Sequence, residues 1–356
     1  MIKQLLRNEV RGLRPVNWGE YDNNSIRLFW GENLIELPEN VIDKVNSKLK
    51  LINRYPDPNQ SELKEIISKY NNVKPKNVTV GNGSDALIEL IAKTFISKGD
   101  QVLIPIPSFI TYSNVTQLMG GKPAYVKLDS NFNLNLPNLI KKINLKTKAI
   151  FIANPNNPTG NYLIDRKGVN KILNNFRGIL VIDECYFELG GLTVCDLIKR
   201  YKNLIILRSF SKGLALAGLR VGYALSSEDI TQYLSKVQKI PQPFEVNILA
   251  QIAAIECIKE RKSIVKNFFS NKKMFISKLK TIKKVGVIDT KTSFILLDLT
   301  KTKKTAKKVK SELEKYKIFT KDCSLFSNLN RYYLYMGIPE KKDFDYVIKA
   351  IWEIIK

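Results

Sequence analysis

The chain has 356 residues, 44% of them hydrophobic, which suits a large α/β enzyme of one or two domains. It contains no histidine, so histidine triads, histidine-ligated metals and histidine acid–base catalysis are excluded. The formal net charge is +25, from 58 basic against 33 acidic residues. The basic residues are spread over most of the chain and form no single stripe, so we expect no nucleic-acid partner.

The sequence carries no signal for a membrane or a metal. It has no run of about eighteen apolar residues and no apolar signal core at its start, which predicts a cytoplasmic protein without a membrane partner. Its four cysteines fit neither a zinc pattern nor a dense disulfide framework. They are widely spaced, at Cys185, Cys195, Cys257 and Cys323. We therefore expect no metal site.

The predicted elements start with an arm of little periodicity over residues 1–36, followed by helices from Pro38 to Leu49 and from Ser61 to Tyr70. Apolar strands and helix-length segments then alternate. The predicted strands cover 77–80, 101–104, 122–127, 148–153, 178–182, 203–207 and 219–225, and the helices 86–92, 108–119, 136–144, 165–175 and 194–201. This alternation predicts a largely parallel sheet covered on both faces, with functional groups beyond the carboxyl ends of its strands.

The pattern changes after residue 245. A long helical segment over 245–280 precedes a mixture of strands and helices. Strands are predicted at 293–299, near 317–320 and at 331–336, and helices at 304–315 and 341–355. We interpret this part as a smaller α+β domain that the N-terminal arm joins. The predicted domains are 1–49 (arm and part of the small domain), 50–245 (large domain) and 246–356 (small domain).

Two loops at predicted strand ends suit a cofactor that carries a phosphate and a phenolate oxygen. The first is Gly81–Asp85, where Ser84 can cap a helix whose N-terminus can receive a phosphate. The second is Asn154–Gly160, in which prolines restrict the backbone, so that the amide of Asn157 can donate to a phenolate oxygen. Taken alone, either segment could be an ordinary turn.

Two further loops complete the pattern. Asp183 ends a buried strand and needs a cationic partner, either a neighbouring lysine or a protonated pyridine nitrogen, and Tyr186 could bond the ring's 3-oxygen. The segment Leu207–Arg220 holds Lys212, whose amine can form a Schiff base with a carbonyl, while its serines and Arg220 can hold a phosphate. A lone lysine of this kind could be a surface residue, but the four loops together predict pyridoxal phosphate.

With these motifs, the chain resembles the fold-type I pyridoxal-phosphate enzymes of the class I/II aminotransferase superfamily, and is most similar to histidinol-phosphate aminotransferases. The resemblance covers nearly the full length. It is carried by Arg7–Leu13, Gly31–Asn33, Asn53–Pro58, Asn156–Gly160, Asp183–Tyr186 and Ser211–Arg220. It implies a mostly parallel seven-stranded sheet sandwiched by helices, a smaller α+β domain, pyridoxal 5'-phosphate as cofactor and a homodimer with shared active sites.

The resemblance also implies roles for single residues. Lys212 would be the catalytic lysine, which forms the aldimine with the cofactor and shuttles a proton. Cofactor contacts are implied for Gly83, Ser84, Asp85, Phe109, Asn157, Asp183, Tyr186, Ser209, Ser211, Arg220 and, from the neighbouring subunit, Tyr55. Substrate contacts are implied for Asn33, Lys321, Arg331 and Tyr333.

The substrate end departs from the family pattern. Tyr333 stands where the family has an arginine, and Arg331, expected two residues earlier on the same strand face, is the candidate replacement. Lys321 takes the place of a second family arginine. In the arm, Val16 replaces a family tyrosine, with Trp18 nearby. These changes leave the cofactor interpretation intact and put histidinol phosphate in question.

We therefore expect an aminotransferase that moves an amino group from a donor, with L-histidinol phosphate as the closest candidate, to a 2-oxo acid such as 2-oxoglutarate. Two alternatives use the same cofactor: a threonine-phosphate decarboxylase-like enzyme, and an aminotransferase of a specialised biosynthetic pathway. A non-enzymatic cofactor-sensing regulator would need a DNA-binding module, and we identify no spare segment for one.

Overall fold

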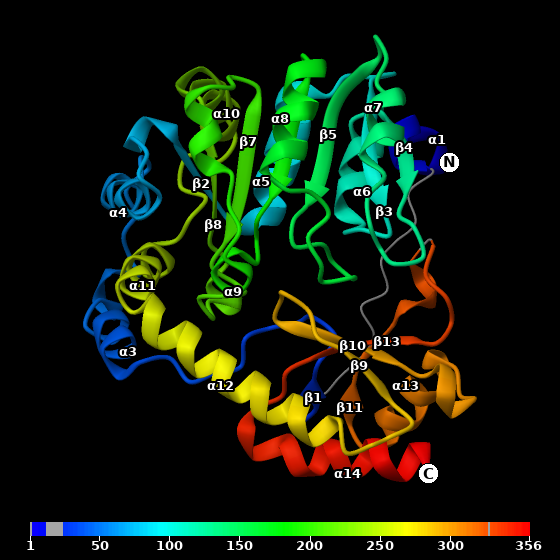
Figure 1. Cartoon of the computed structure of the whole chain (residues 1–356). Coiled ribbons are helices and arrows are strands. Elements are labelled where there is room, and N and C mark those ends of the chain that lie inside the picture. The colour runs from blue at the N-terminus through cyan, green and yellow to red at the C-terminus, as the bar shows by residue number, and fades with distance from the viewer. Residues whose placement is uncertain (1, 12–23, 327) are drawn as a thin grey trace.

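The computed structural model describes residues 2–11, 24–326 and 328–356 (Figure 1). Two sheets organise the chain. The large sheet and its helices fill the upper half of Figure 1, and the small sheet lies below. Helix α12 (Arg261–Leu279) runs from beneath the large sheet to the side of the small one.

The large sheet has seven strands in the order β2-β8-β7-β6-β5-β3-β4. They are β2 (Val78–Gly81), β3 (Gln101–Ile106), β4 (Lys122–Lys127), β5 (Thr147–Ala153), β6 (Ile179–Asp183), β7 (Leu204–Ser209) and β8 (Gly222–Ser226). The strands from β3 to β7 pair in parallel, and β8 runs antiparallel to both β7 and β2. The predicted, largely parallel sheet is confirmed. Strand β8 reverses because residues 210–221 connect it to β7 without a crossover helix.

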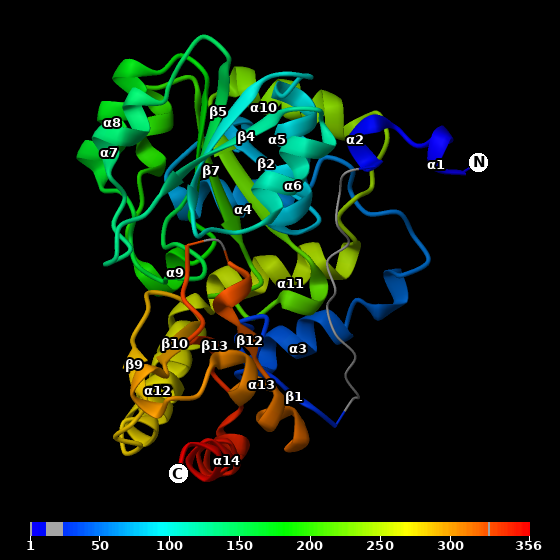
Figure 2. The same ribbon diagram turned by 90° about the vertical axis from the view of Figure 1, so that its right-hand side faces the viewer.

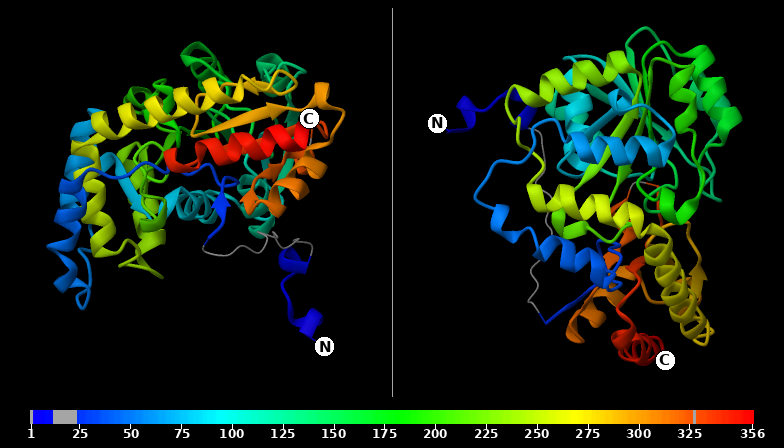
Figure 3. Two further views of the ribbon diagram at one scale, coloured as in Figure 1. Left: turned by 90° about the horizontal axis from the view of Figure 1, so that it is seen from below. Right: turned by 90° about the vertical axis from the view of Figure 1, so that its left-hand side faces the viewer.

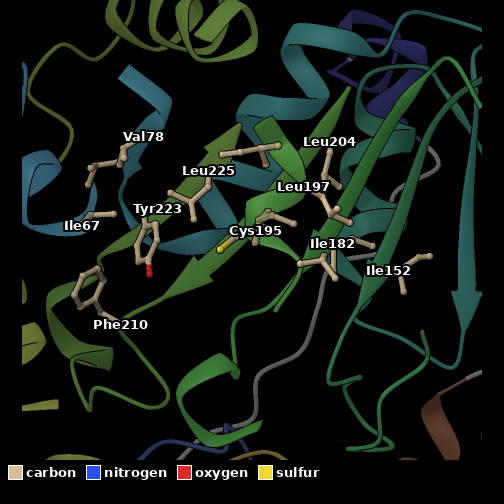
Figure 4. Close-up of a cluster of buried hydrophobic side chains, with 14 of the residues drawn as sticks. Ile67, Val78, Ile152, Ile182, Cys195, Leu197, Leu204, Phe210, Tyr223 and Leu225 are labelled. Carbon is tan, nitrogen blue, oxygen red and sulfur yellow. The ribbon is translucent and has the colours of Figure 1, made fainter. Parts of the chain in front are cut away.

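Helices cover both faces of the large sheet, which explains why its inner strands are apolar at most positions, whereas the edge strand β4 is partly exposed. One face carries α5 (Gly83–Phe95), α6 (Thr111–Leu118) and α10 (Glu228–Lys239). The other carries α4 (Ser61–Asn71), α7 (Leu136–Lys141), α8 (Arg166–Asn175) and α11 (Ile248–Lys259). Figure 2 shows α7 and α8 on the opposite side of the sheet from α5 and α6. Figure 4 shows part of the second core, where Ile67 of α4 lies beside Val78 of β2.

The small sheet has four antiparallel strands in the order β12-β13-β10-β9. They are β9 (Gly286–Ile288), β10 (Phe294–Asp298), β12 (Lys321–Asp322) and β13 (Tyr333–Gly337). Their core is shared with α12, α13 (Ala306–Lys315) and α14 (Phe344–Ile355). The α/β fold class with a second, smaller α+β part is thereby confirmed.

The N-terminal region contacts both parts of the molecule. Strand β1 (Ile26–Arg27) pairs in parallel with β11 (Ile318–Phe319) near the small sheet. Helix α1 (Ile2–Leu5) extends away from the body of the molecule (Figure 3), whereas α2 (Asn8–Arg11) lies against α6, and Arg7 just before it donates to the carbonyl of Leu118 at 3.1 Å. Helix α3 (Glu39–Asn46) packs on α11 and joins the core of the large sheet. The domain boundaries given above stay predictions.

Several predicted helices differ in detail. The helical segment expected over 245–280 is two helices, α11 and α12, which meet at Glu260. The helix expected at 194–201 is a short 3-10 helix, Cys195–Lys199. Helix α10 was not predicted, although Ser227, whose hydroxyl accepts from the amide of Ile230, is a recognisable helix start. Helix α9 (Phe187–Gly190) and β9 were not predicted either, because both are very short.

The described helices include none that is long and apolar enough to span a membrane. All four cysteines are buried and free. In the same described ranges, no three potential metal ligands gather in one place.

Candidate active site

The predicted motifs meet at one edge of the large sheet, on the side of the small sheet. Strands β5 and β6 end level with each other, because their last residues, Ala153 and Asp183, are paired. Asp183 also pairs with Leu207, and β7 continues for two residues to Ser209. Beyond these ends lie the loops with Asn157, Tyr186 and Lys212. Tyr186 packs into the core of the small sheet, so the site lies between the two sheets.

Asp183 is a buried carboxylate that has no positive partner among the residues that the structure describes. The hydroxyl of Tyr112 donates to its Oδ2 at 2.6 Å, and the amide of Cys185 donates to its Oδ1 at 3.0 Å. No described lysine or arginine forms an ion pair with it, and burial raises its pKa. A protonated pyridine nitrogen would supply the cation that this buried carboxylate needs, so the residues around Asp183 fit pyridoxal phosphate at this corner.

The next corner offers donors for a ring oxygen. The side-chain amide of Asn157 donates to the hydroxyl of Tyr186 at 3.3 Å, so the two predicted partners of the 3-oxygen do lie together. Phe109 follows β3 and meets Tyr112 edge-on, with ring centroids 5.7 Å apart. Phe109, Asn157 and Tyr186 are therefore gathered near Asp183.

A group of polar residues near the start of α5 suits a phosphate. The guanidinium of Arg220 donates to Ser211 Oγ at 3.2 Å and to Asp85 Oδ2 at 3.1 Å, and Ser209 Oγ accepts from the Ser211 amide at 3.1 Å. At Gly83, which has a φ of +80°, a Cβ would lie 2.5 Å from Arg220 Nη2, so glycine leaves room for the guanidinium.

Ser84 does not cap this helix as predicted. Asn82 is the N-cap of α5, and Ser84 lies within the first turn. The first N–H groups of a helix lack partners within the helix and carry its positive pole, and here Arg220 stands beside them. The arrangement therefore favours a phosphate.

Lys212 is held by the N-terminal segment. Its Nζ donates to the carbonyl oxygen of Trp30 at 2.8 Å, and burial lowers its pKa. Asn33 donates to the carbonyl of Gly213 at 3.3 Å, while its buried Oδ1 has no hydrogen-bond partner among the described residues. The predicted catalytic lysine and Asn33 are thus adjacent, and Asn33 keeps an acceptor open.

The predicted substrate residues divide into two groups. Lys321 lies between the rings of Phe326 and Tyr335, 5.7 and 5.8 Å from their centroids, and burial lowers its pKa. Tyr333 begins β13 and meets Phe132, which packs against the core of the large sheet, edge-on at 5.7 Å. Both residues are at least partly buried near the junction of the two sheets.

Arg331 lies apart from them. Its expected place on the strand face of Tyr333 is wrong, because β13 begins only at Tyr333. The side chain is exposed, and its guanidinium donates to the hydroxyl of Tyr332 at 3.2 Å. Val16 and Trp18 lie outside the described residues.

Tyr55 lies on the surface. Its side chain is 80% exposed, and its ring stacks on Phe244 with centroids 4.4 Å apart. Phe244 is itself 40% exposed.

Sequence reasoning missed Tyr112 and a set of buried charges behind the site. Arg208 of β7 forms an ion pair with Glu184 at 2.7 Å, and both side chains are buried. Glu188 of α9 has buried carboxylate oxygens and would touch a Cβ at Gly213. The only sequence signal for Tyr112 is its spacing of three residues from Phe109; Arg208 and Glu188 look like ordinary surface charges.

The sequence model of the protein family "Aminotransferase class I and II" matches residues 23–347 of this chain. A histidinol-phosphate aminotransferase of Thermoanaerobacter sp. is 37% identical over 364 residues, which cover 100% of both chains. The solved histidinol-phosphate aminotransferase of Sinorhizobium meliloti, in complex with pyridoxal-5'-phosphate, has a TM-score of 0.87 at 20% identity and covers 98% of this chain and 97% of its own.

A third likeness bears on the decarboxylase alternative. The L-threonine-O-3-phosphate decarboxylase of Porphyromonas gingivalis has a TM-score of 0.76 at 26% identity, over 93% of this chain and 99% of its own. Its identity is below that of the full-length aminotransferase relative, so the decarboxylase is not favoured. The chain belongs to the aminotransferase class I and II family and is a pyridoxal-phosphate-dependent transaminase.

Proposed function

We propose that this transaminase works in the cytoplasm, takes its amino group from L-histidinol phosphate and delivers it to a 2-oxo acid such as 2-oxoglutarate. The observation that carries the proposal is the 37% identity, over the whole chain, to a relative named for that substrate. The net charge of +25 would favour the approach of an anionic substrate.

Each corner of the cofactor has a proposed partner in this chain. Asp183 would pair with the pyridine nitrogen, Asn157 and Tyr186 would bind the 3-oxygen, and Phe109 would cover a face of the ring. The phosphate would be held by Gly83, Ser84, Asp85, Ser209, Ser211 and Arg220. When bound, pyridoxal phosphate supplies the electron sink that lets the carbon bearing the amino group lose a proton.

Lys212 is the proposed proton carrier. Burial lowers the pKa of its amine, which increases the fraction that is neutral and able to accept a proton. The carbonyl of Trp30 holds Nζ in place, and no histidine competes for this role. Lys212 would therefore accept, at Nζ, the proton from the carbon that bears the amino group. It would then deliver this proton to the C4′ carbon of the cofactor.

The substrate would meet residues from both parts of the chain. Lys321 is the proposed partner of an anionic group, because its ammonium is partly buried between two rings without a carboxylate in contact among the described residues. Asn33, whose Oδ1 accepts no hydrogen bond from the described residues, and Tyr333 are the other proposed substrate contacts. Arg331, which is exposed, would act only from the rim of the site.

A screen of amino donors tests the substrate. The purified enzyme, loaded with pyridoxal phosphate, is mixed with single donors and no acceptor, and conversion to pyridoxamine phosphate is followed by absorbance. L-histidinol phosphate should react fastest. Release of carbon dioxide from phosphothreonine would support the decarboxylase instead, and a faster reaction with another donor would point to a specialised pathway.

We further propose a homodimer in which Tyr55 reaches the phosphate of the neighbouring subunit. Support comes from exposed apolar side chains in the two adjoining loops: Ile52 (68%), Tyr55 (80%), Ile240 (79%) and Phe244 (40%). Mixing Lys212→Ala with Tyr55→Ala protein tests the shared site. If the subunits exchange, heterodimers contain one intact site and activity returns. Exchange shown by sedimentation without any return of activity would contradict it.

A further inference from the structure

Tyr112 is a fully buried side chain of α6 that reaches Asp183 from another element. Its hydroxyl donates to Asp183 Oδ2 at 2.6 Å. The other carboxylate oxygen accepts from the backbone amide of Cys185 at 3.0 Å. The carboxylate is thus fixed from two sides, by the hydroxyl of Tyr112 on one and by the amide and thiol of Cys185 on the other.

The ring of Tyr112 is fixed as well. It stacks on Phe151 of β5, with centroids 5.1 Å apart and planes at 20°, and meets Phe109 edge-on at 5.7 Å and 83°. One side chain therefore contacts both Asp183, the expected partner of the pyridine nitrogen, and Phe109, the expected cover of its ring. Neither contact belongs to the motifs found in the sequence.

The electrostatics make Tyr112 a permanent donor. Burial, followed by the charge of Asp183, raises the pKa of Tyr112 well above its usual value, so its hydroxyl keeps its proton. The other groups that face Asp183 are the thiol and amide of Cys185, the hydroxyl of Tyr186 and the carboxylate of Asp85. None carries a positive charge. The tyrosine donor therefore opposes the effect of burial by lowering the pKa of Asp183.

We propose that Tyr112 is a positioning residue, which keeps Asp183 ionised and aimed at the pyridine nitrogen and supports Phe109 against the cofactor ring. The inference rests on the roles proposed above for Asp183 and Phe109. Tyr112 would touch neither substrate nor cofactor; it would act through Asp183 and Phe109, which do.

The test measures how tightly apoenzymes bind pyridoxal phosphate, by equilibrium dialysis over a range of pH. Tyr112→Phe removes one hydroxyl and keeps the ring against Phe151. We expect the dissociation constant to rise about tenfold, as for a lost hydrogen bond to a charged group. The surface variant Tyr233→Phe, on α10 and 61% exposed, should bind like wild type.

The pH dependence separates positioning from packing. Without the tyrosine donor, the pKa of Asp183 rises, so the pH below which affinity is lost should move upward in Tyr112→Phe. A general loss of packing would lower affinity at every pH alike. Thermal unfolding of the apoenzymes shows whether each variant is folded. The acid limb, which is the loss of pyridoxal-phosphate affinity at low pH, could be measured even in a variant of lower stability.

A double-mutant cycle of Tyr112→Phe and Asp183→Asn tests whether Tyr112 acts through Asp183. If Tyr112 acts through Asp183, Tyr112→Phe should weaken binding by less than about twofold once Asp183 is already asparagine. Additive effects, or a Tyr112→Phe enzyme with wild-type affinity and acid limb, would overturn the inference while leaving the proposed function intact. A wild-type chain that does not bind pyridoxal phosphate at all would overturn both.

Discussion

Two neighbouring carboxylates at the end of β6 lie in opposite electrostatic surroundings. Glu184 is paired within the chain: Arg208 contacts it at 2.7 Å, the hydroxyl of Thr193 donates at 2.8 Å and the amide of Val194 at 2.9 Å. Asp183 receives hydrogen bonds from Tyr112 and Cys185 but no ion pair from the described residues. The chain thus neutralises the charge of Glu184, which we call the rear side, with its own arginine. It leaves the charge of Asp183, which we call the front side, for a ligand to pair with.

The rear charge cluster, made of Glu184, Glu188 and Arg208, contains two carboxylates and one guanidinium. Arg208 uses Nε and Nη2 on Glu184 and Thr193, and its guanidinium lies 3.5 Å from the ring centroid of Phe187. Glu188 then lacks a hydrogen bond to any described residue. Two carboxylates share one guanidinium, so the second is forced toward its neutral form.

The largest effect expected on the front side is that of Lys212→Ala. Removing the amine removes the proton carrier, so transamination should fall by about a thousandfold or more. Steady-state assays with L-histidinol phosphate and 2-oxoglutarate measure it, with the exposed Lys273→Ala as control. A Lys212→Ala enzyme with a tenth of wild-type activity would remove Lys212 from the mechanism.

On the rear side, Arg208→Met should mainly affect stability. It leaves Glu184 buried without its cation, which costs about 3–5 kcal/mol of the free energy of unfolding. Urea unfolding of the apoenzyme measures it. The exposed pair Arg166–Asp196 gives the control, because Arg166→Met should cost less than about 1 kcal/mol. Equal losses for the two arginines would show that burial does not distinguish them.

Glu188→Gln tests the unpaired carboxylate through pH. Burial raises the pKa of Glu188 to about 7 from its ordinary 4.5, with Arg208 opposing and Glu184 adding to the shift. The folded chain therefore holds a proton that the unfolded chain releases. The resulting stability, about 3 kcal/mol, is complete below pH 4.5 and is lost as the pH rises to 7.

The Gln variant should lack this component of the pH dependence. Chemical unfolding at several pH values measures the slope in both proteins. Because the chain has no histidine, imidazole titration cannot produce such a slope between pH 4.5 and 7. Identical slopes would mean that Glu188 is ionised throughout this range.

The smallest effect is expected for Asp183→Asn in the apoenzyme. Burial raises the pKa of Asp183, so its charge does not stabilise the empty fold, and the free energy of unfolding should stay within about 1 kcal/mol of wild type. Glu184→Gln should be clearly more destabilising, because it breaks the buried pair. A larger loss of stability for Asp183→Asn than for Glu184→Gln would contradict the difference proposed between these two carboxylates.

The cofactor side of the site could be predicted because its residues follow directly from chain order. Lys212, Asp183 and Asn157 stand after apolar strands, and the carboxyl ends of parallel strands gather at one edge. Tyr112 could not be predicted, because its hydrogen bond joins residues 71 positions apart and leaves no local pattern. Arg331 was misplaced because the start of a strand is uncertain by about two residues.

The hold of Trp30 on Lys212 has a consequence for the order in which the chain matures. The segment 26–33 leaves the ribosome early, yet its partners come late: the Ile26 amide bonds the carbonyl of Lys317, and the Gly337 amide bonds the carbonyl of Leu28. The large sheet ends at residue 226 and can assemble during synthesis with Lys212 in place. The carbonyl that holds the lysine is anchored only after the C-terminal part has emerged, so segment 26–33, although it is made before Lys212, takes its place in the catalytic centre after it.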